Sequence, residues 1–135
     1  MDLYHSINIA ASGMKAQGTR LRIVAENLAN ADSIGDNPNQ APFRRQLTIF
    51  ADEHDKAMDA NRVIVKKITE DPSEFRREYQ PNHPAADAQG FVRLPNVHTL
   101  IELMDMREAS RSYEANVNVM ENSRAMLTRT IDMLR

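Results

Sequence analysis

Cysteine and tryptophan are both absent from this chain of 135 residues. Without cysteine, the chain can form no disulfide, no thiol nucleophile and no cysteine-ligated zinc site. Aromatic residues make up only 5% of the chain, whereas Met reaches 8. Flexible methionines suit helices with adaptable apolar faces, and so few aromatics argue against a dense β-sandwich core. A chain of this length is expected to form one domain.

Neither sign of charge dominates, because 17 basic residues face 19 acidic ones and the net charge is −2. No segment has a strong excess of one sign, so the basic patch of a nucleic-acid-binding protein is missing and we expect no nucleic-acid partner. Long apolar runs are absent from the first thirty residues. We therefore expect neither a cleaved secretory signal nor direct membrane insertion.

Proline is missing from both ends of the chain, since all six prolines lie between residues 35 and 95. Proline breaks helix interiors, so its absence permits long helices at both ends. We expect an N-terminal helix in 1–34, an insertion in 35–95 and a C-terminal helix in 96–135. The fold class is then mainly α, with the two long helices pairing as a coiled-coil-like hairpin and a small central β-hairpin with an extended segment.

Apolar residues repeat every seven positions at both ends, which is typical of helices that pack along narrow stripes. We expect these rows to join the two helices to each other and to form an assembly interface with other subunits. The N-terminal rows, interrupted by Gln17, include Leu3, Ile7, Ala10, Met14, Leu21, Val24, Leu28 and Ala31. The C-terminal rows include Leu103, Met106, Tyr113, Val117, Met120, Leu127, Ile131 and Leu134. A third row, Val119, Met126 and Met133, is apolar on another side and should meet a partner outside the hairpin.

The insertion is rich in β-branched residues, as in RVIVKKI at 62–68. We expect a β-hairpin at about 62–80, formed by 62–69 and 75–80 with a turn at Pro72, and residues 46–50 could add a third strand. The charged residues between, 51–61, predict a loop or a short helix.

The stretch YQPNHPAADAQGFVRLP holds three of the six prolines and looks like a site. Proline fixes φ and biases the residue before it toward extended backbone, so residues 81–95 predict a stiff connector, with Gly90 supplying a turn. It leads to the last helix, for which Asn96 or Thr99 could serve as the N-cap.

Chemical motifs are scarce. His83 and Asp87 could face one ion, but two ligands do not make a zinc site. The metalloprotease, nucleophile-elbow and glycine-rich phosphate patterns are absent from the sequence. We therefore expect no enzyme, no catalytic or metal site and no cofactor. Two alternatives remain open, namely a soluble helical-hairpin chaperone or adaptor, and a small metal-dependent hydrolase at His83 and Asp87.

Several strings resemble a known family. SGMKAQGTRLRIVAENLANADS resembles the N-terminal signature of bacterial flagellar rod and hook proteins. YQPNHPAADAQGFVRLPNV followed by EASRSYEANVNV is similar to the proximal rod proteins within that family. The matching positions are Ser12, Gly13, Ala16, Gln17, Asn27, Leu28, Asn30, Pro84, Gly90, Pro95, Asn96, Tyr113, Glu114, Ala115 and Asn116.

The resemblance implies a structural subunit of the flagellar basal-body rod, which polymerises helically through its terminal helices and transmits torque. It implies export through the flagellar type III apparatus without signal cleavage, and a place in the rod that crosses the periplasm. The implied partners are copies of itself, other rod proteins, and basal-body ring and export-apparatus proteins. We also expect the isolated subunit to keep both terminal segments partly disordered until it assembles.

Overall fold

The computed structural model describes residues 3–134, so residues 1, 2 and 135 of the predicted terminal regions lie outside the described residues. Residues 3–134 form two long helices and four strands. In chain order these are α1 (Leu3–Ala29), β1 (Gln46–Asp55), β2 (Ala60–Glu70), β3 (Arg76–Tyr79), β4 (Phe91–Leu94) and α2 (Thr99–Met133). The expectation of a mainly α fold with a central β-hairpin is confirmed.

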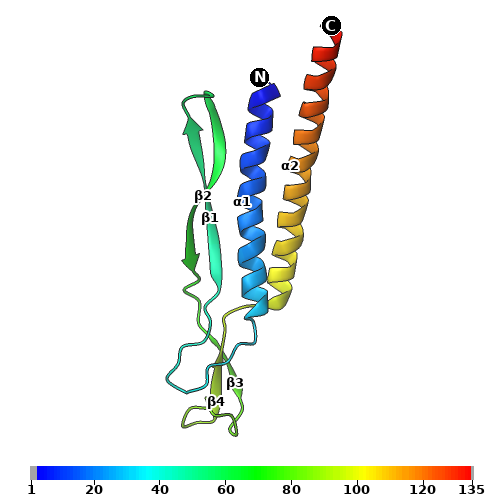
Figure 1. The fold of residues 1–135 in the computed structure, drawn as a ribbon. Helices are drawn as coiled ribbons and strands as arrows, with labels where there is room; N and C mark the ends of the chain where they lie inside the picture. Colours follow the sequence, from blue (N-terminus) through cyan, green and yellow to red (C-terminus); the bar gives the residue numbers. More distant parts are fainter. Residues whose placement is uncertain (1–2, 135) are drawn as a thin grey trace.

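Three rod-like units lie side by side, the β1–β2 hairpin, α1 and α2, with α1 in the middle (Figure 1). The short β3–β4 unit lies at the end where α1 finishes and α2 begins. Both chain ends lie at the opposite end. Because α2 has 35 residues and α1 has 27, the end of α2 projects beyond the start of α1 (Figure 1). The molecule is therefore elongated.

The strand pairing differs from the sequence-based prediction. β1 pairs antiparallel with β2, from Gln46 opposite Glu70 to Asp55 opposite Ala60, and β3 pairs antiparallel with β4. The predicted pairing of 62–69 with 75–80 is therefore wrong. Residues 51–55, expected in a loop or helix, continue β1.

The turn between β1 and β2 explains this error. Asp55 closes it, because its carbonyl accepts from the Met58 amide and its carboxylate accepts from the Ala57 amide at 2.9 Å. Asp59 then takes a positive φ of 47°, which aspartate tolerates better than most residues. The turn contains no glycine or proline, so its sequence lacks the usual hairpin signal.

The proline-rich connector is partly a strand. Residues 91–94 form β4, which pairs antiparallel with β3. The predicted stiff segment therefore turns back alongside β3 before it reaches α2. Gly90 has φ +83°, and a Cβ there would lie 2.8 Å from the Tyr79 ring. The turn at this position therefore requires glycine for both backbone conformation and space.

The core is narrow. It includes small or β-branched side chains along α1 and α2 and a compact group where β4 leads into α2. The buried apolar residues include Ala10, Ala16, Ile23, Val24, Ala109, Val92, Leu94 and Val97. Many larger apolar side chains of α2 lie outside this core and remain exposed.

Candidate functional site

A buried carboxylate joins three segments of the chain. Glu102, in the first turn of α2, is 0% exposed. Its Oε1 accepts a hydrogen bond from Arg45 Nε at 2.5 Å, and its Oε2 accepts one from Asn27 Nδ2 at 3.1 Å. The end of α1, the start of β1 and the start of α2 therefore meet at one side chain.

Asp71 extends this arrangement to the end of β2. Its Oδ2 lies 3.3 Å from Arg45 Nη1. The amide and side chain of Ser73 hold the pKa of Asp71 below its usual value, and Arg45 adds to this effect. Burial lowers the pKa of Arg45, but Glu102 and Asp71 outweigh it and raise that pKa above its usual value. Asp71 and Arg45 therefore stay charged at neutral pH.

Asn96 completes the group. Its Oδ1 accepts from the Arg45 amide at 2.8 Å, while its Nδ2 donates to the Asp71 carbonyl and to Ser73. It is therefore not the cap of α2. The N-cap is His98, which makes no side-chain cap bond. We call Asn27, Arg45, Asp71, Asn96 and Glu102 the polar junction.

Two polar side chains of α1 bind the two edges of the hairpin. Asn27 exchanges a pair of 2.8 Å hydrogen bonds with the backbone N–H and C=O of Gln46 on β1, as a neighbouring strand would. Ser12 Oγ accepts from the Val63 amide on β2 at 3.3 Å. Unpaired strand edges are a liability, and these two positions of the family signature partly satisfy them.

On the α2 side, small and polar residues contribute to the contact between the helices. A Cβ at Gly13 would lie 2.8 Å from the Asn116 side chain, so the helices approach closely there. The side chain of Asn116 is held by a 2.8 Å bond to the Ser112 carbonyl. The inward row of α2, spaced by seven, is Glu102, Ala109, Asn116 and Ser123.

The predicted C-terminal rows are buried only in part within the chain. Leu103, Leu127, Ile131 and Leu134 are exposed, whereas Met106, Val117 and Met120 are half-buried. Their role in contacts between subunits stays a prediction. On α1 the row that contains Ala10, Val24 and Ala31 is buried, as expected. The remaining predicted interface residues are half-buried, apart from the exposed Tyr113, and they are Leu3, Ile7, Met14, Leu21, Leu28, Met106, Val117 and Met120.

The other signature positions have mixed surroundings. Gln17 Oε1 is buried and finds no hydrogen-bond partner among residues 3–134. Asn30 Nδ2 donates to the Glu26 carbonyl at 2.8 Å, at the end of α1. Ala16 and Pro95 are buried, whereas Pro84, Glu114 and Ala115 are exposed, and nothing in the structure explains those three.

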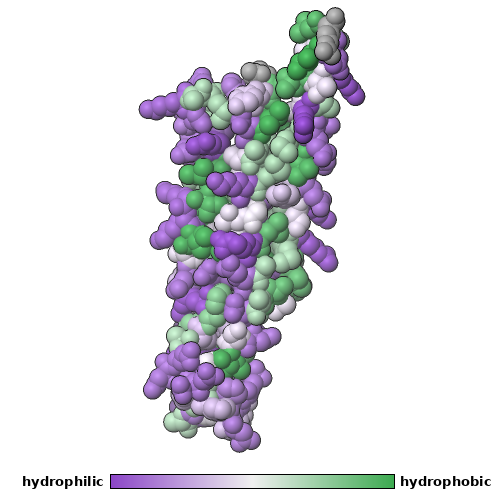
Figure 2. All heavy atoms as spheres, viewed as in Figure 1, coloured by the Kyte–Doolittle hydropathy of each residue, from purple (hydrophilic) through white to green (hydrophobic). Residues whose placement is uncertain are grey.

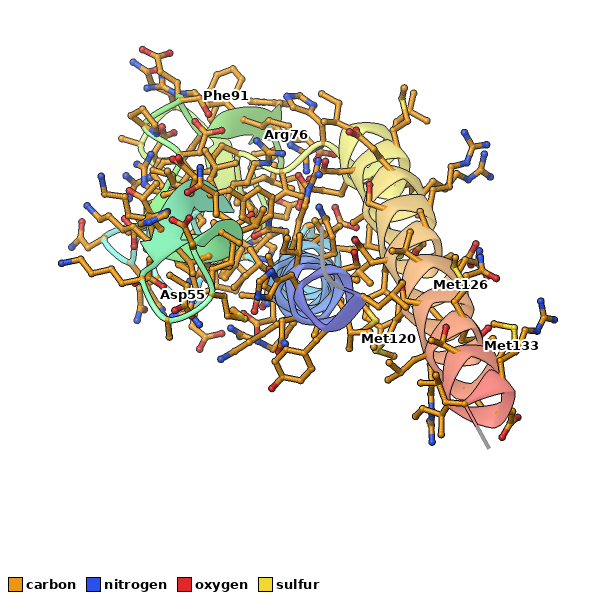
Figure 3. The ribbon with its side chains drawn as sticks, turned by 90° about the horizontal axis from the view of Figure 1, so that it is seen from above. Asp55, Arg76, Phe91, Met120, Met126 and Met133 are labelled. Carbon is orange, nitrogen blue, oxygen red and sulfur yellow. The ribbon has the colours of Figure 1, made fainter. Side chains whose placement is uncertain are left out.

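An apolar stripe runs along the open side of α2. Its residues are Ile101, Met104, Val119, Met126 and Met133, and all are exposed. Met133, at 79% exposure, lies on the projecting end. Seen along the helices, Met120 lies toward α1, while Met126 and Met133 lie on the far side of α2 (Figure 3). Hydrophobic residues gather along α2 and at its projecting end, whereas the β3–β4 end is mostly hydrophilic (Figure 2).

A groove of about 600 Å³ lies between β1 and α2. Ile23 and Val24 of α1 contribute apolar side chains to it, and Ile101 and Met104 of the stripe line its α2 side. Within it, Arg20 forms an ion pair with Asp105 and approaches Glu108 at 3.7 Å. The charges in the groove thus already have partners.

His83 and Asp87 serve separate turns. His83 Nδ1 accepts from the Ala85 amide at 3.1 Å. Asp87 accepts from the Phe91 and Gln89 amides, and the first of these chiefly lowers the pKa of Asp87. Residues 3–134 contain no group of three side chains placed to hold a metal ion. They also contain no helix long and apolar enough to cross a membrane.

Three members of the polar junction were not identified from the sequence. Arg45, Asp71 and Glu102 look like ordinary surface charges, and each is separated from the others by more than twenty residues. One signal was present, because Glu102 interrupts the apolar run TLIELM at the start of α2. A carboxylate inside such a run is either exposed or paired.

Comparisons with known proteins agree with this architecture at both ends. The family model described as "Flagella basal body rod protein" matches residues 7–35, and that described as "Flagellar basal body rod FlgEFG protein C-terminal" matches residues 88–133. A relative from Agrobacterium fabrum, named "Flagellar basal-body rod protein FlgC", is 50% identical over 94% of this chain and 91% of its own length. Relatives of the same name from Yersinia enterocolitica and Bacillus subtilis are 37% and 35% identical over 98% of this chain and 98% and 99% of their own lengths.

Proposed function

This chain belongs to the FlgC family of flagellar basal-body rod proteins, and we propose that it builds the rod by burying its open helical faces against neighbouring subunits. It is a structural subunit of the rod and not an enzyme. The names of the relatives support neither the chaperone nor the hydrolase alternative.

The observation that carries the proposal is the apolar stripe of α2. Met104, Met126 and Met133 are 64%, 51% and 79% exposed in the single chain. Exposed apolar side chains gathered on one side of a helix indicate a protein-interaction site. The end of α2 projects beyond α1 (Figure 1), so α1 leaves it uncovered and a neighbouring chain can cover it. Copies of this chain and other rod proteins are the proposed partners.

Further parts of the proposal rest on the family. We propose that subunits stack helically through α1 and α2, cross the periplasm and transmit torque. We also propose export through the flagellar apparatus without signal cleavage, and contacts with basal-body ring and export-apparatus proteins. The junction supports a torque-bearing role, because it ties the hairpin and both helices together through several charged and polar bonds.

The test uses a motile strain that lacks this chain and is complemented with variants. Met126→Asp should abolish swimming and rod assembly, because it places a charge in a subunit contact. The unfolding free energy of the purified subunit should change by less than about 0.5 kcal/mol, since the side chain is exposed in the single chain. Asn118→Asp, which adds the same charge to an exposed polar position of α2, is the control and should swim. Normal swimming of Met126→Asp would contradict the proposal.

A further inference from the structure

The outer edge of β1 is open next to the groove. The Asp71 amide donates to the Arg45 carbonyl at 2.8 Å, whereas the backbone of Gln46 bonds to Asn27. In an antiparallel pair, successive residues point their backbone groups alternately toward the partner strand and away from it. The backbone N–H and C=O of Gln46 therefore point away from β2. The backbone groups of every second residue after Gln46 must point the same way.

Thr48 and Phe50 are the next two positions on this edge. The register shift opposite Ile49 and Phe50 does not change the alternation, because the unmatched residue, Lys66, lies on β2. The other strand supports the assignment. The Val63 amide points outward to Ser12, and Val63 lies opposite Asp52 on β1. The backbone N–H and C=O groups of the even-numbered residues of β1 therefore point away from β2.

These outward backbone groups have no partner among the described residues. No side chain or loop among residues 3–134 bonds to the backbone N–H or C=O of Thr48 or Phe50. Both residues line the groove, together with Gln46 and Leu47 of the same strand. The side chain of Asn27 bonds to Gln46, the preceding outward position on the same edge. Thr48 and Phe50 therefore extend an edge that is already bonded at Gln46.

We propose that this groove binds an extended segment of a neighbouring polypeptide chain, which adds a strand to the free edge of β1. An extended backbone offers one donor and one acceptor at every second residue, which matches Thr48 and Phe50. A helix has its backbone groups already bonded, so it would bury those of Thr48 and Phe50 without partners. The occupant is therefore a strand.

The lining of the groove also limits the side chains of this strand. Its apolar residues include Ile23, Ile101 and Met104. Its two arginines are already paired, Arg20 with Asp105 and Arg45 with Glu102. A charged side chain would enter without a counter-ion. The segment should therefore place uncharged, apolar side chains toward α2. This inference rests on the proposed function, because the neighbouring chain is taken to be another rod subunit.

A pair of variants tests the edge in the complemented strain. Thr48→Pro removes one outward N–H, and an edge strand accepts proline where its N–H faces out. Thr48→Val keeps the N–H and suits a strand. We expect Thr48→Val to swim as wild type and Thr48→Pro to lose swimming, while the purified Thr48→Pro subunit keeps the thermal midpoint of Thr48→Val within a few degrees. If the wild-type gene restores swimming and both variants swim equally well, the inference is overturned and the proposed function stays intact.

A second measurement does not depend on the fold of the proline variant. A photo-crosslinking phenylalanine analogue replaces Met104 in assembled rods, and the cross-linked peptides are identified by mass spectrometry. We expect attachment to a short apolar segment of a rod subunit, with the Thr48 and Phe50 amides exchanging hydrogen slowly in rods and quickly in free subunits. Attachment to a helix of a neighbour, or fast exchange of these amides in rods, would overturn the inference. Attachment to β1 of a second copy would also overturn it, since that would indicate edge-to-edge pairing of two hairpins.

Discussion

At the scale of single residues, the polar junction depends on one buried ion pair. Glu102 is 0% exposed, whereas the side chain of Arg45 is 19% exposed. The free-energy cost of removing one partner therefore depends on which charge is left behind. A fully buried carboxylate without its partner has no access to water, while a partly exposed guanidinium can be rehydrated.

This asymmetry gives a prediction. Arg45→Met should lower the unfolding free energy by about 3–5 kcal/mol, because it leaves Glu102 buried with Asn27 alone. Glu102→Leu should lower it less, by about 1–3 kcal/mol, since solvent screens the remaining arginine. Urea unfolding of the purified subunit measures both. Glu108→Gln, at an exposed carboxylate, is the control. Equal losses for the two junction variants would show that burial does not set the difference.

Asp71 makes part of the junction sensitive to acid. Its pKa is lowered from 3.8 in the folded state, chiefly by Ser73. A group with a lowered folded pKa adds stability above its unfolded pKa and loses it as the pH falls through the folded one. The wild-type subunit should therefore lose stability below about pH 4, and Asp71→Asn should lose less over the same range. Urea midpoints at pH 6 and pH 3 test this. An equal fall of the urea midpoint from pH 6 to pH 3 in both proteins would contradict it.

At the scale of elements, the two glycines of α1 show where α2 comes close. A Cβ at Gly13 would lie 2.8 Å from the Asn116 side chain of α2, whereas a Cβ at Gly18 would meet nothing within 4 Å. Two glycines of one helix thus have different roles. One admits the neighbouring helix, and the other only weakens helix propensity.

Alanine at each position should separate these roles. Gly18→Ala should raise the unfolding free energy by up to about 1 kcal/mol, through helix propensity. Gly13→Ala gains the same propensity, but Asn116 must move and give up its bond to the Ser112 carbonyl, so the net effect should be zero or destabilising. Thermal unfolding of the two purified variants measures the difference. Stabilisation of both by similar amounts would show that the close approach at Gly13 is unimportant.

The elements also show what the sequence could and could not predict. The long helices followed from proline-free, periodic ends, and the buried α1 row of Ala10 and Val24 was predicted. The inward face of α2 was missed, since Glu102, Ala109 and Ser123 do not form an apolar pattern. The hairpin was misassigned because Pro72 looks like a turn, whereas the real turn at Asp55 depends on side-chain bonds that no simple sequence pattern reveals.

At the scale of the whole molecule, stability and assembly are divided along the long axis. The polar junction and the buried Val92 and Val97 lie where β4 leads into α2. The other end carries the projecting turns of α2, with Met126 and Met133 exposed. One end therefore holds the subunit together, and under the proposed function the other end is completed by neighbours.

This division predicts a gradient of hydrogen exchange in the free subunit. Amides near Asn27 and Val97 should be the slowest, because they open only with the junction. Amides of α2 from 124 to 134 should exchange fastest among the helical residues, since a helix end without packing is marginal. The beginning of α1 should lie between these limits, because it has the hairpin on one side and α2 on the other. Exchange measured by mass spectrometry on dilute subunit and on assembled rods should show the largest increase in protection at 124–134. If that segment is already protected in a monodisperse monomer, or if it stays unprotected in rods, then neighbours do not order it and the assembly role of the α2 stripe is wrong.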